Sequence, residues 1–323
     1  MLKVTVVILG DGLASTAVGP LEVFFAAGML FPTLKGETPN QLFDVTTVSL
    51  DGKSVSAAYG LGLTPQKSIE DIERTDIIIV PTSGIEVDLK LIENSALLPW
   101  LRKHHALGAY IAGTCMGSVY LAEAGLLDGR EATTHWAATQ DFERRYPKVK
   151  WRPDLLITED SRLLCSGGVT SAIDVSLYLV EKLISHDIAV QTAKALLHPM
   201  PRINQSGYAV LPLSPPHEDA RIREVESYIQ KNFRTDLGIE SLAEKFGMSG
   251  RTFLRRFKAA TGRLPGAYVQ AVRVEVAKSM LERDRASVQT IASHVGYEDV
   301  SFFRTLFKRL TGMTPGDYRS HFG

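Results

Sequence analysis

S-L-A-E-K-F-G-M-S-G-R-T-F-L-R-R-F-K-A-A-T-G-R-L-P-G-A-Y, residues 241–268, is the stretch that decides how the C-terminal part of this chain folds. A related stretch, T-I-A-S-H-V-G-Y-E-D-V-S-F-F-R-T-L-F-K-R-L-T-G-M-T-P-G-D-Y, occupies residues 290–318. Each copy reads as a short helix, a turn at a glycine and a second helix rich in basic side chains. This is the arrangement of a helix-turn-helix, whose second helix enters the major groove of DNA. The residues shared at an offset of 50 are Phe253, Phe257, Gly262, Pro265 and Tyr268, which match Phe303, Phe307, Gly312, Pro315 and Tyr318.

The second helix of each unit has a face that we predict to contact DNA. Phe253 and Phe257 lie four residues apart and must face a core, so that side chains on the opposite face are exposed. Ser249 is the expected N-cap of this helix. Arginine can bind guanine bidentately, whereas lysine more often contacts phosphate. A basic face that is merely solvated is the alternative, and the repeat argues against it. The residues predicted to contact DNA are Arg251, Thr252, Arg255, Lys258, Ser301, Arg304, Thr305 and Lys308.

A further helix is predicted between the two units, over residues 267–281. Its apolar side chains Val269, Val272, Val276 and Met280 lie on one side. Such a helix would hold the two units rigidly, so that recognition helices one DNA turn apart, ~34 Å, could enter successive major grooves.

The charges of the chain are unevenly distributed, although the net charge of the 323 residues is zero. Residues 217–323 contain 18 Lys and Arg against 13 Asp and Glu, which leaves 18 basic and 23 acidic residues before them. A basic C-terminal third on an acidic body suits a DNA-binding module joined to a part with a different task.

The composition also excludes some classes of protein. No apolar run reaches the ~18 residues that a membrane span requires. The start M-L-K-V-T-V-V-I-L-G is too short and too strand-like for a signal peptide. Two cysteines make no disulfide framework, so we expect a cytoplasmic protein without membrane association.

The chain is predicted to divide at a proline-rich linker. Residues 198–217 contain five prolines, which block helices and remove backbone donors. We therefore expect one domain over residues 1–197 and another over residues 218–323. The second is predicted to be all-α, with the two helix-turn-helix units.

The first domain alternates strands with helices. Its β-branched runs are bounded by turns, and buried strands interleaved with helices favour an α/β fold with a mostly parallel sheet covered on both faces. Active sites in such sheets lie at the carboxyl ends of the strands. The strands are expected at residues 4–9, 43–50, 77–80 and 109–112, and the helices at residues 19–27, 89–104, 116–124 and 173–184.

The segment A-Y-I-A-G-T-C-M-G-S predicts a sharp turn between a strand and a helix. The strand ends at Ala112, the turn passes through Gly113, and a helix begins beyond Cys115. This places the thiol at a helix N-terminus, where unpaired amides and the helix dipole would stabilise a thiolate. Hydrolases present their nucleophile on a turn of the same kind.

Several motifs together resemble a known family. The G-T-C-M-G-S turn, G-P-L-E-V-F at residues 19–24, T-T-H-W at 133–136 and S-G-G-V-T-S-A-I-D at 166–174 are similar to the ThiJ/PfpI branch of the class I glutamine-amidotransferase-like superfamily. The tandem helix-turn-helix resembles AraC/XylS regulators. Nearly the whole chain therefore resembles GlxA-type transcriptional regulators.

The resemblance implies a site that has lost its chemistry. In the superfamily a turn cysteine works with a histidine, and in this branch a glutamate near the first helix contacts the thiol; the matching residues are Cys115, His135 and Glu22. Amidotransferases place a glutamate two residues after the histidine, where this chain has Ala137, and the peptidase-like branch has a histidine where this chain has Met116. We therefore expect no catalytic residue and no enzyme.

A ligand pocket is expected at the same place. Backbone amides of the turn could hold a carboxylate, Glu22 could meet a cationic amine, and Trp136 could bind a quaternary ammonium through its ring face. A merely buried Cys115 and a Trp136 packed in the core are the alternatives. The predicted ligand-binding residues are Glu22, Ser83, Gly84, Cys115, Met116, His135 and Trp136.

The leading hypothesis is a regulator, expected to be an activator, that responds to a small amino-acid- or amine-like inducer. Its partners would be double-stranded DNA, the inducer and a second copy bound through the N-terminal domain. No cofactor and no metal site are expected, since His104 and His105 are adjacent on a helix and cannot face one ion. The rival hypothesis is a cysteine-dependent hydrolase or amidase with an appended DNA-binding domain. An architectural DNA protein would not explain the large first domain.

Overall fold

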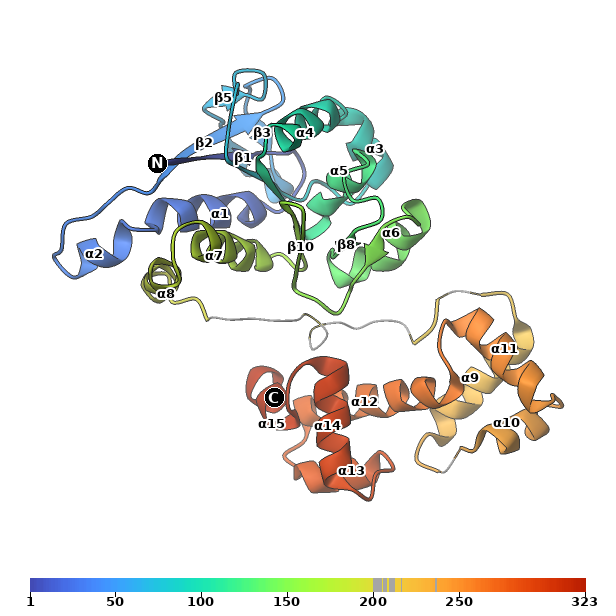
Figure 1. Cartoon of the computed structure of the whole chain (residues 1–323). Coiled ribbons are helices and arrows are strands. Elements are labelled where there is room, and N and C mark those ends of the chain that lie inside the picture. The colour runs from blue at the N-terminus through green and yellow to red at the C-terminus, as the bar shows by residue number, and fades with distance from the viewer. Residues whose placement is uncertain (200–204, 206–207, 209–212, 216, 236) are drawn as a thin grey trace. The chain divides into compact units, whose positions relative to one another are not determined.

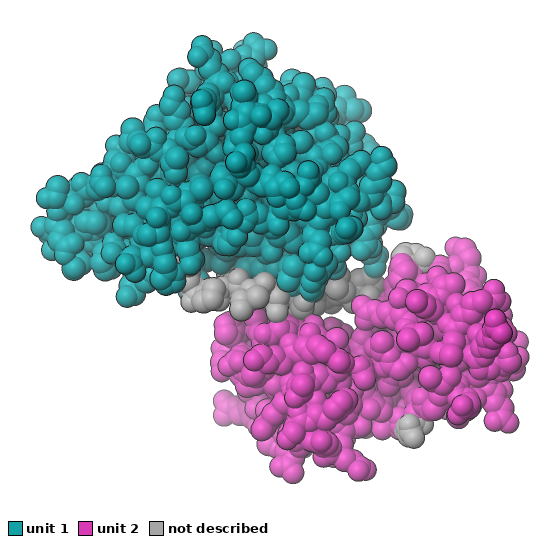
Figure 2. Space-filling model, viewed as in Figure 1, with its two compact units in different colours: residues 1–205 teal, residues 206–323 magenta. Residues whose placement is uncertain are grey.

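The computed structural model of this protein describes residues 1–199, 205, 208, 213–215, 217–235 and 237–323 (Figure 1). Two units are present, residues 1–205 and residues 206–323 (Figure 2). Much of the segment predicted to be the linker, residues 198–217, lies outside the described residues. No described helix is both long enough and apolar enough to cross a membrane.

The first unit is built on a seven-stranded sheet in the order β10-β11-β7-β6-β1-β2-β5. Neighbouring strands run parallel, except that β10 is antiparallel to β11. The prediction of a mostly parallel sheet is therefore confirmed. The strands are β1 (Leu2–Val7), β2 (Phe43–Ser49), β5 (Lys67–Ser68), β6 (Ile77–Val80), β7 (Tyr110–Thr114), β10 (Ile157–Asp160) and β11 (Leu163–Ser166).

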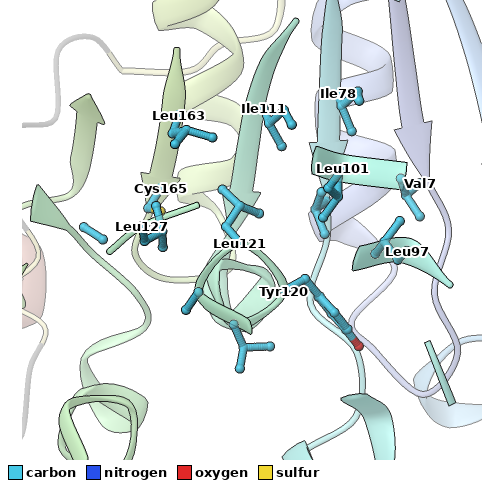
Figure 3. Packing of buried hydrophobic residues seen from close by; sticks show 14 of the residues in the cluster. Val7, Ile78, Leu97, Leu101, Ile111, Tyr120, Leu121, Leu127, Leu163 and Cys165 are labelled. Atoms are coloured by element: carbon cyan, nitrogen blue, oxygen red, sulfur yellow. The ribbon is translucent and has the colours of Figure 1, made fainter. Parts of the chain in front are cut away.

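Helices cover both faces of this sheet, because successive residues of each buried strand point to opposite sides. Ile77 and Ile79 of β6 pack with α1, α7 and α8, whereas Ile78 and Val80 pack with α4, α5 and α6. Figure 1 shows the helices on the two faces, and Figure 3 shows Ile78 with Leu97 and Leu101 in the second of these clusters. The helices are α1 (Ser15–Ala26), α3 (Val87–Glu93), α4 (Leu97–Ala106), α5 (Ser118–Glu123), α6 (Thr139–Arg145), α7 (Ser171–Leu183) and α8 (His186–Ala195). The smaller elements are α2 (Leu30–Leu34), the pair β3 (Val55–Ser56) and β4 (Gly62–Leu63), and the pair β8 (Glu131–Ala132) and β9 (Lys150–Trp151).

One local prediction in this unit was wrong, and one element was missed. The single helix expected over residues 89–104 is broken into α3 and α4, because Asn94 ends α3 and its side chain donates to the carbonyl of Lys90 (2.8 Å). The hairpin of β10 and β11 was not predicted. Ser161 and Arg162 both adopt positive φ in its tight turn, a conformation for which neither residue type is a strong sequence signal.

The regular elements among the described residues of the second unit are all helices, as predicted, and its two helix-turn-helix units are built alike. Gly262 and Gly312 end the two recognition helices in the left-handed conformation, and Pro265 and Pro315 open the helices that follow. The predicted N-cap Ser249 is confirmed, since its hydroxyl accepts the amide of Thr252 (3.4 Å). The helices are α9 (Ala220–Asn232), α10 (Ile239–Lys245), α11 (Gly250–Thr261), α12 (Pro265–Arg283), α13 (Val288–His294), α14 (Val300–Thr311) and α15 (Pro315–Phe322).

Helix α12 is the helix predicted between the two units, and it belongs to both of their cores. Val269 and Val272 pack in the first core, whereas Val274, Ala277 and Leu281 pack in the second. The predicted apolar stripe therefore lacked these last three residues, and its members Val276 and Met280 are only partly buried. Because one continuous helix of 19 residues enters both cores, the two helix-turn-helix units are held in one arrangement.

Arg273, near the middle of α12, strengthens this arrangement. Its guanidinium donates to the carbonyls of Phe233 (2.8 Å), Thr235 (3.0 Å) and Gly296 (3.0 Å) and lies 4.9 Å from the ring centroid of Tyr297. Phe233 and Thr235 precede the first helix-turn-helix unit, and Gly296 is the turn of the second. The Arg273 side chain thus connects the two helix-turn-helix units through hydrogen bonds to both.

Candidate effector site and nucleic-acid interface

The strand–turn–helix predicted around Cys115 is present. Strand β7 ends at Thr114, Cys115 follows with φ of +56°, and a single 3-10 turn over Cys115–Gly117 leads into α5. A non-glycine residue in this conformation is strained, and such strain is common at functional sites. Glycines allow the close approach on both sides: a Cβ on Gly113 would lie 2.8 Å from Ser118, and a Cβ on Gly117 would lie 2.2 Å from the carbonyl of Val80.

The Cys115 thiol is neutral in this setting, so the predicted thiolate was wrong. The side chain is only 4% exposed, and its burial raises the pKa of the thiol to about 11. Hydrogen bonds from the Met116 backbone and the Thr82 side chain lower the pKa, but by less than burial raises it. The helix dipole contributes little here, because α5 is short and begins only at Ser118.

The two ring nitrogens of His135 have different roles: Nδ1 accepts a hydrogen bond, and Nε2 is left as a donor. Its Nδ1 accepts the amide of Ala137 (3.1 Å), so that the neutral ring carries its proton on Nε2. Burial lowers the pKa of the ring, which favours this neutral form. A general base for the Cys115 proton needs an unprotonated nitrogen, and this tautomer uses its free lone pair on Ala137. Trp136 lies beside the imidazole, with ring centroids 5.2 Å apart, and both side chains are half-buried.

Glu22 does not lie with the thiol as the resemblance implied. It is exposed on α1, and within the described residues it makes no hydrogen bond or ion pair. The part of α1 that meets the turn is its first turn, where the carbonyl of Thr16 accepts the hydroxyl of Thr114 (3.3 Å). Glu22 follows Thr16 by six residues, about 9 Å along a helix that runs away from the carboxyl edge of the sheet.

Ser83 and Gly84 lie in the loop after β6, and the groups that they contact stabilise the fold. The Ser83 hydroxyl lies 2.6 Å from the Tyr120 hydroxyl, which also accepts from Asn94 (3.0 Å). A Cβ on Gly84 would touch Lys90, a buried cation that bonds to Asp11 (2.5 Å) and Glu93 (2.6 Å). The Ser83 hydroxyl therefore already has a partner within the fold, the Tyr120 hydroxyl. Met116, which follows Cys115, is half-buried.

Two threonines at the turn were missed from the sequence. The Thr82 side chain hydrogen-bonds with the Cys115 thiol, and the Thr134 hydroxyl donates to the Cys115 carbonyl (3.1 Å). They belong to the loops that follow β6 and β8, so only the fold brings them to Cys115. A separate groove of about 520 Å³ lies between α1 and β2, with Leu21 and Val45 in its walls, and is not lined by Cys115.

The predicted DNA-contacting residues lie on the outer faces of α11 and α14. The four core phenylalanines of these helices, Phe253, Phe257, Phe303 and Phe307, are fully buried. Thr252 is half-buried beneath its cap, and the other predicted residues are exposed: Arg251, Arg255, Lys258, Ser301, Arg304, Thr305 and Lys308. The two helices thus present polar faces in matching register.

Phe302 is a surface residue of α14 that the sequence analysis missed. Its side chain is 48% exposed, although it is apolar, and its ring centroid lies 5.7 Å from that of Tyr297. Asp299 caps the helix and accepts the amides of Ser301 (2.8 Å) and Phe302 (3.1 Å). The repeat contained the signal, because Phe302 matches the predicted Thr252 at the same offset of 50.

Relatives of this chain include regulators and one enzyme. The HTH-type transcriptional regulator CdhR of Pseudomonas aeruginosa is 28% identical over 275 residues, 84% of this chain and 80% of CdhR. The regulator GlxA of Rhizobium meliloti is 25% identical over 287 residues, 87% of this chain and 86% of GlxA. The isonitrile hydratase of Pseudomonas putida is 35% identical over 136 residues, 42% of this chain and 57% of the enzyme.

Two family models match the two units, as the motif resemblance predicted. The helix-turn-helix domain model matches residues 242–321, which contain both repeats. The model of the DJ-1/PfpI family matches residues 6–182, which contain the sheet and the turn at Cys115. The chain therefore belongs to the DJ-1/PfpI family and carries a C-terminal helix-turn-helix domain of the AraC type.

Proposed function

We infer that this protein is a transcriptional regulator that binds specific DNA and responds to a small metabolite. The observation that carries this function is the pair of recognition helices, α11 and α14, whose polar faces lie in the same register on either side of one rigid helix. Arginines near the start of such a helix can reach base edges in the major groove. The two regulators that match along most of the chain support the same function.

The metabolite is proposed to bind beside Cys115 rather than react there. The Nε2–H of His135 is a donor for a carboxylate, and the half-buried ring of Trp136 offers a face to a cationic amine. A molecule with both groups is an amino acid or a betaine-like compound. Glu22 and the Ser83 hydroxyl are left out of this site, since the first is exposed on α1 and the second is bonded to Tyr120.

We further propose that the protein is an activator, that it works in the cytoplasm, and that it forms a homodimer through the first unit. Closed two-fold dimers are the commonest soluble homo-oligomers, and a dimer would bring four helix-turn-helix units to one DNA region. A ligand that binds only the folded protein must raise its stability, by about 2.7 kcal/mol at ~100 times Kd. A thermal-shift panel of amino acids and quaternary amines therefore identifies the metabolite.

The rival function, a cysteine-dependent hydrolase or amidase, is distinguished by Cys115→Ser. We expect the variant to fold, to bind DNA and to keep its ligand-induced thermal shift, because serine nearly preserves the volume at the turn while removing the thiol. Neither protein should consume amide, glutamine or isonitrile substrates, which chromatography would measure. Cys165→Ser, at a buried cysteine of β11, is the matched control. Substrate consumption that disappears only in Cys115→Ser would establish the rival function.

Phe302 is expected to contact a thymine methyl group in the operator. Replacing that thymine by uracil removes one methyl group and should weaken binding about fourfold, since a buried methylene-sized group contributes about 0.8 kcal/mol. In Phe302→Ala the same base replacement should have no effect. Fluorescence anisotropy on duplexes with single uracils checks this, with Leu310→Ala, exposed near the other end of α14, as the control. An unchanged uracil penalty in Phe302→Ala would rule the contact out.

A further inference from the structure

Gln205 is the last residue of the first unit, and its side chain is buried in that unit. It is only 2% exposed, although the prolines around it predicted an extended linker. Its backbone amide donates to the carbonyl of Asp154 (3.2 Å). The chain is therefore seated on the first unit immediately before it continues to the second.

The Gln205 amide group binds the loop that carries the candidate site. Its Nε2 lies within hydrogen-bond distance of the Thr134 carbonyl (2.8 Å), the Thr133 hydroxyl (3.1 Å) and the Leu155 carbonyl (3.2 Å). Thr134 immediately precedes His135. Two hydrogens serve three acceptors, so this one side chain fixes the loop that leads into the imidazole.

The position of Gln205 among Thr133, Thr134 and Leu155 is called its seat here. Thr134 connects this seat to the strained turn at Cys115. Its carbonyl accepts from Gln205, while its hydroxyl donates to the carbonyl of Cys115 (3.1 Å). A ligand that displaces Cys115 or His135 would act on Thr134, which is bonded to the Cys115 carbonyl and immediately precedes His135. Two hydrogen bonds, both made by Thr134, therefore connect the turn at Cys115 with Gln205.

The other wall of the seat is a glycine loop. A Cβ on Gly167 would lie 2.4 Å from the Gln205 Oε1, so that only glycine leaves room for the amide group. The next residue, Gly168, faces the His135 ring, since its Cβ would lie 3.9 Å from Cδ2. Gln205 therefore lies between two loops that both flank His135.

The seat is only partly satisfied. The buried Gln205 Oε1 has no hydrogen-bond partner among the described residues, and a buried acceptor left unpaired is unfavourable. His198, seven residues earlier, is held separately by Asp174 of α7 (3.1 Å). His198 and Gln205 are thus held by separate partners, so that Gln205 can change its contacts without a change at His198.

We propose that Gln205 is the positioning residue through which occupancy of the Cys115–His135 site controls how the chain is held where the first unit ends. Gln205 is held by Thr133, Thr134 and Leu155. Displacement of Thr134 by a ligand breaks its bond to Gln205 and loosens that residue. This inference rests on the proposed function, because loosening of Gln205 matters only if the second unit binds DNA. It also explains why a polar side chain, the amide of Gln205, is buried at this position.

The first test measures the reactivity of Cys115 in the full chain. Iodoacetamide should alkylate Cys115 at least tenfold faster in Gln205→Ala than in the unmutated protein, because Thr134 loses its bond to Gln205 and then holds the turn less firmly. Mass spectrometry follows each cysteine, and the buried Cys165 reports global opening. Gln41→Ala, an exposed glutamine of the same unit, is the control. A Cys115 rate within twofold of the unmutated one, or equal acceleration of both cysteines, would overturn the proposal.

The second test runs in the opposite direction. Thr134→Val removes the bond to Cys115 and should accelerate hydrogen exchange of the Gln205 amide at least tenfold. Thr139→Val is the matched control, because Thr139 is also buried and its hydroxyl has no partner among the described residues. Unchanged exchange in Thr134→Val, or equal acceleration in Thr139→Val, would show that the turn at Cys115 and Gln205 are not connected.

DNA affinity in the same variants separates this inference from the function on which it rests. Gln205→Ala should change the affinity of the full chain for its operator at least threefold, and Gln41→Ala should not. An unchanged affinity would refute the control of DNA binding by Gln205. No operator binding by the unmutated protein would instead refute the proposed function itself.

Discussion

Replacing Arg251 and Arg255 together by alanine should abolish most sequence-specific DNA binding while the protein remains folded. Both side chains are exposed on α11, and each bidentate contact with a base is worth about 1–3 kcal/mol. Fluorescence anisotropy with operator and unrelated duplexes measures it, since the difference between the two affinities should shrink.

Arg256→Ala is the control for this prediction. Arg256 lies on the same helix, but its guanidinium is paired with Asp219 (2.6 and 2.9 Å) and is directed to α9 rather than to DNA. Its replacement should leave the affinity for the operator nearly unchanged. An equal loss in Arg256→Ala, or no loss in the double variant, would show that α11 does not read bases.

Phe257→Ala and Phe307→Ala should each lower the free energy of unfolding of the second unit by about 3–5 kcal/mol, the usual cost of truncating a buried phenylalanine. Phe257 packs edge-on against Tyr268 (5.4 Å between centroids), and Phe307 packs in the same way against Tyr318 (5.5 Å). The two losses should be similar because the two cores are built from the same repeat. Chemical denaturation followed by circular dichroism measures them.

Phe302→Ala is the control for stability, since this phenylalanine is 48% exposed and should change the free energy of unfolding by no more than about 0.5 kcal/mol. A loss below about 1 kcal/mol in either core variant would mean that the phenylalanine is not a core residue. The repeat would then not define two equivalent cores.

The second unit could be predicted in detail because its signals are local. The pairs Phe253–Phe257 and Phe303–Phe307 fix the phase of each recognition helix, and the glycines and prolines that follow fix its end. Phe302 was missed because an apolar residue next to a core residue is expected to be buried. Only the register of the repeat places it on the surface.

The site in the first unit could be predicted only in outline. The strand–turn–helix at Cys115 follows from the sequence, but the pKa of its thiol depends on burial by distant elements. The position of Glu22 depends on where α1 begins relative to the edge of the sheet. Gln205 carries no local signal, because its proline-rich surroundings predict an extended chain while its side chain is fixed by Thr134 and Gly167.

The central claim is that one chain places two recognition helices in successive major grooves. Selection of duplexes from a random library by the full chain, followed by footprinting of the selected sites at several salt concentrations, tests it most directly. We expect two protected blocks whose centres are about 10–10.5 base pairs apart and an affinity that falls steeply with salt, because each neutralised phosphate releases counterions. Failure to enrich any sequence, or binding that does not respond to salt, would contradict the account.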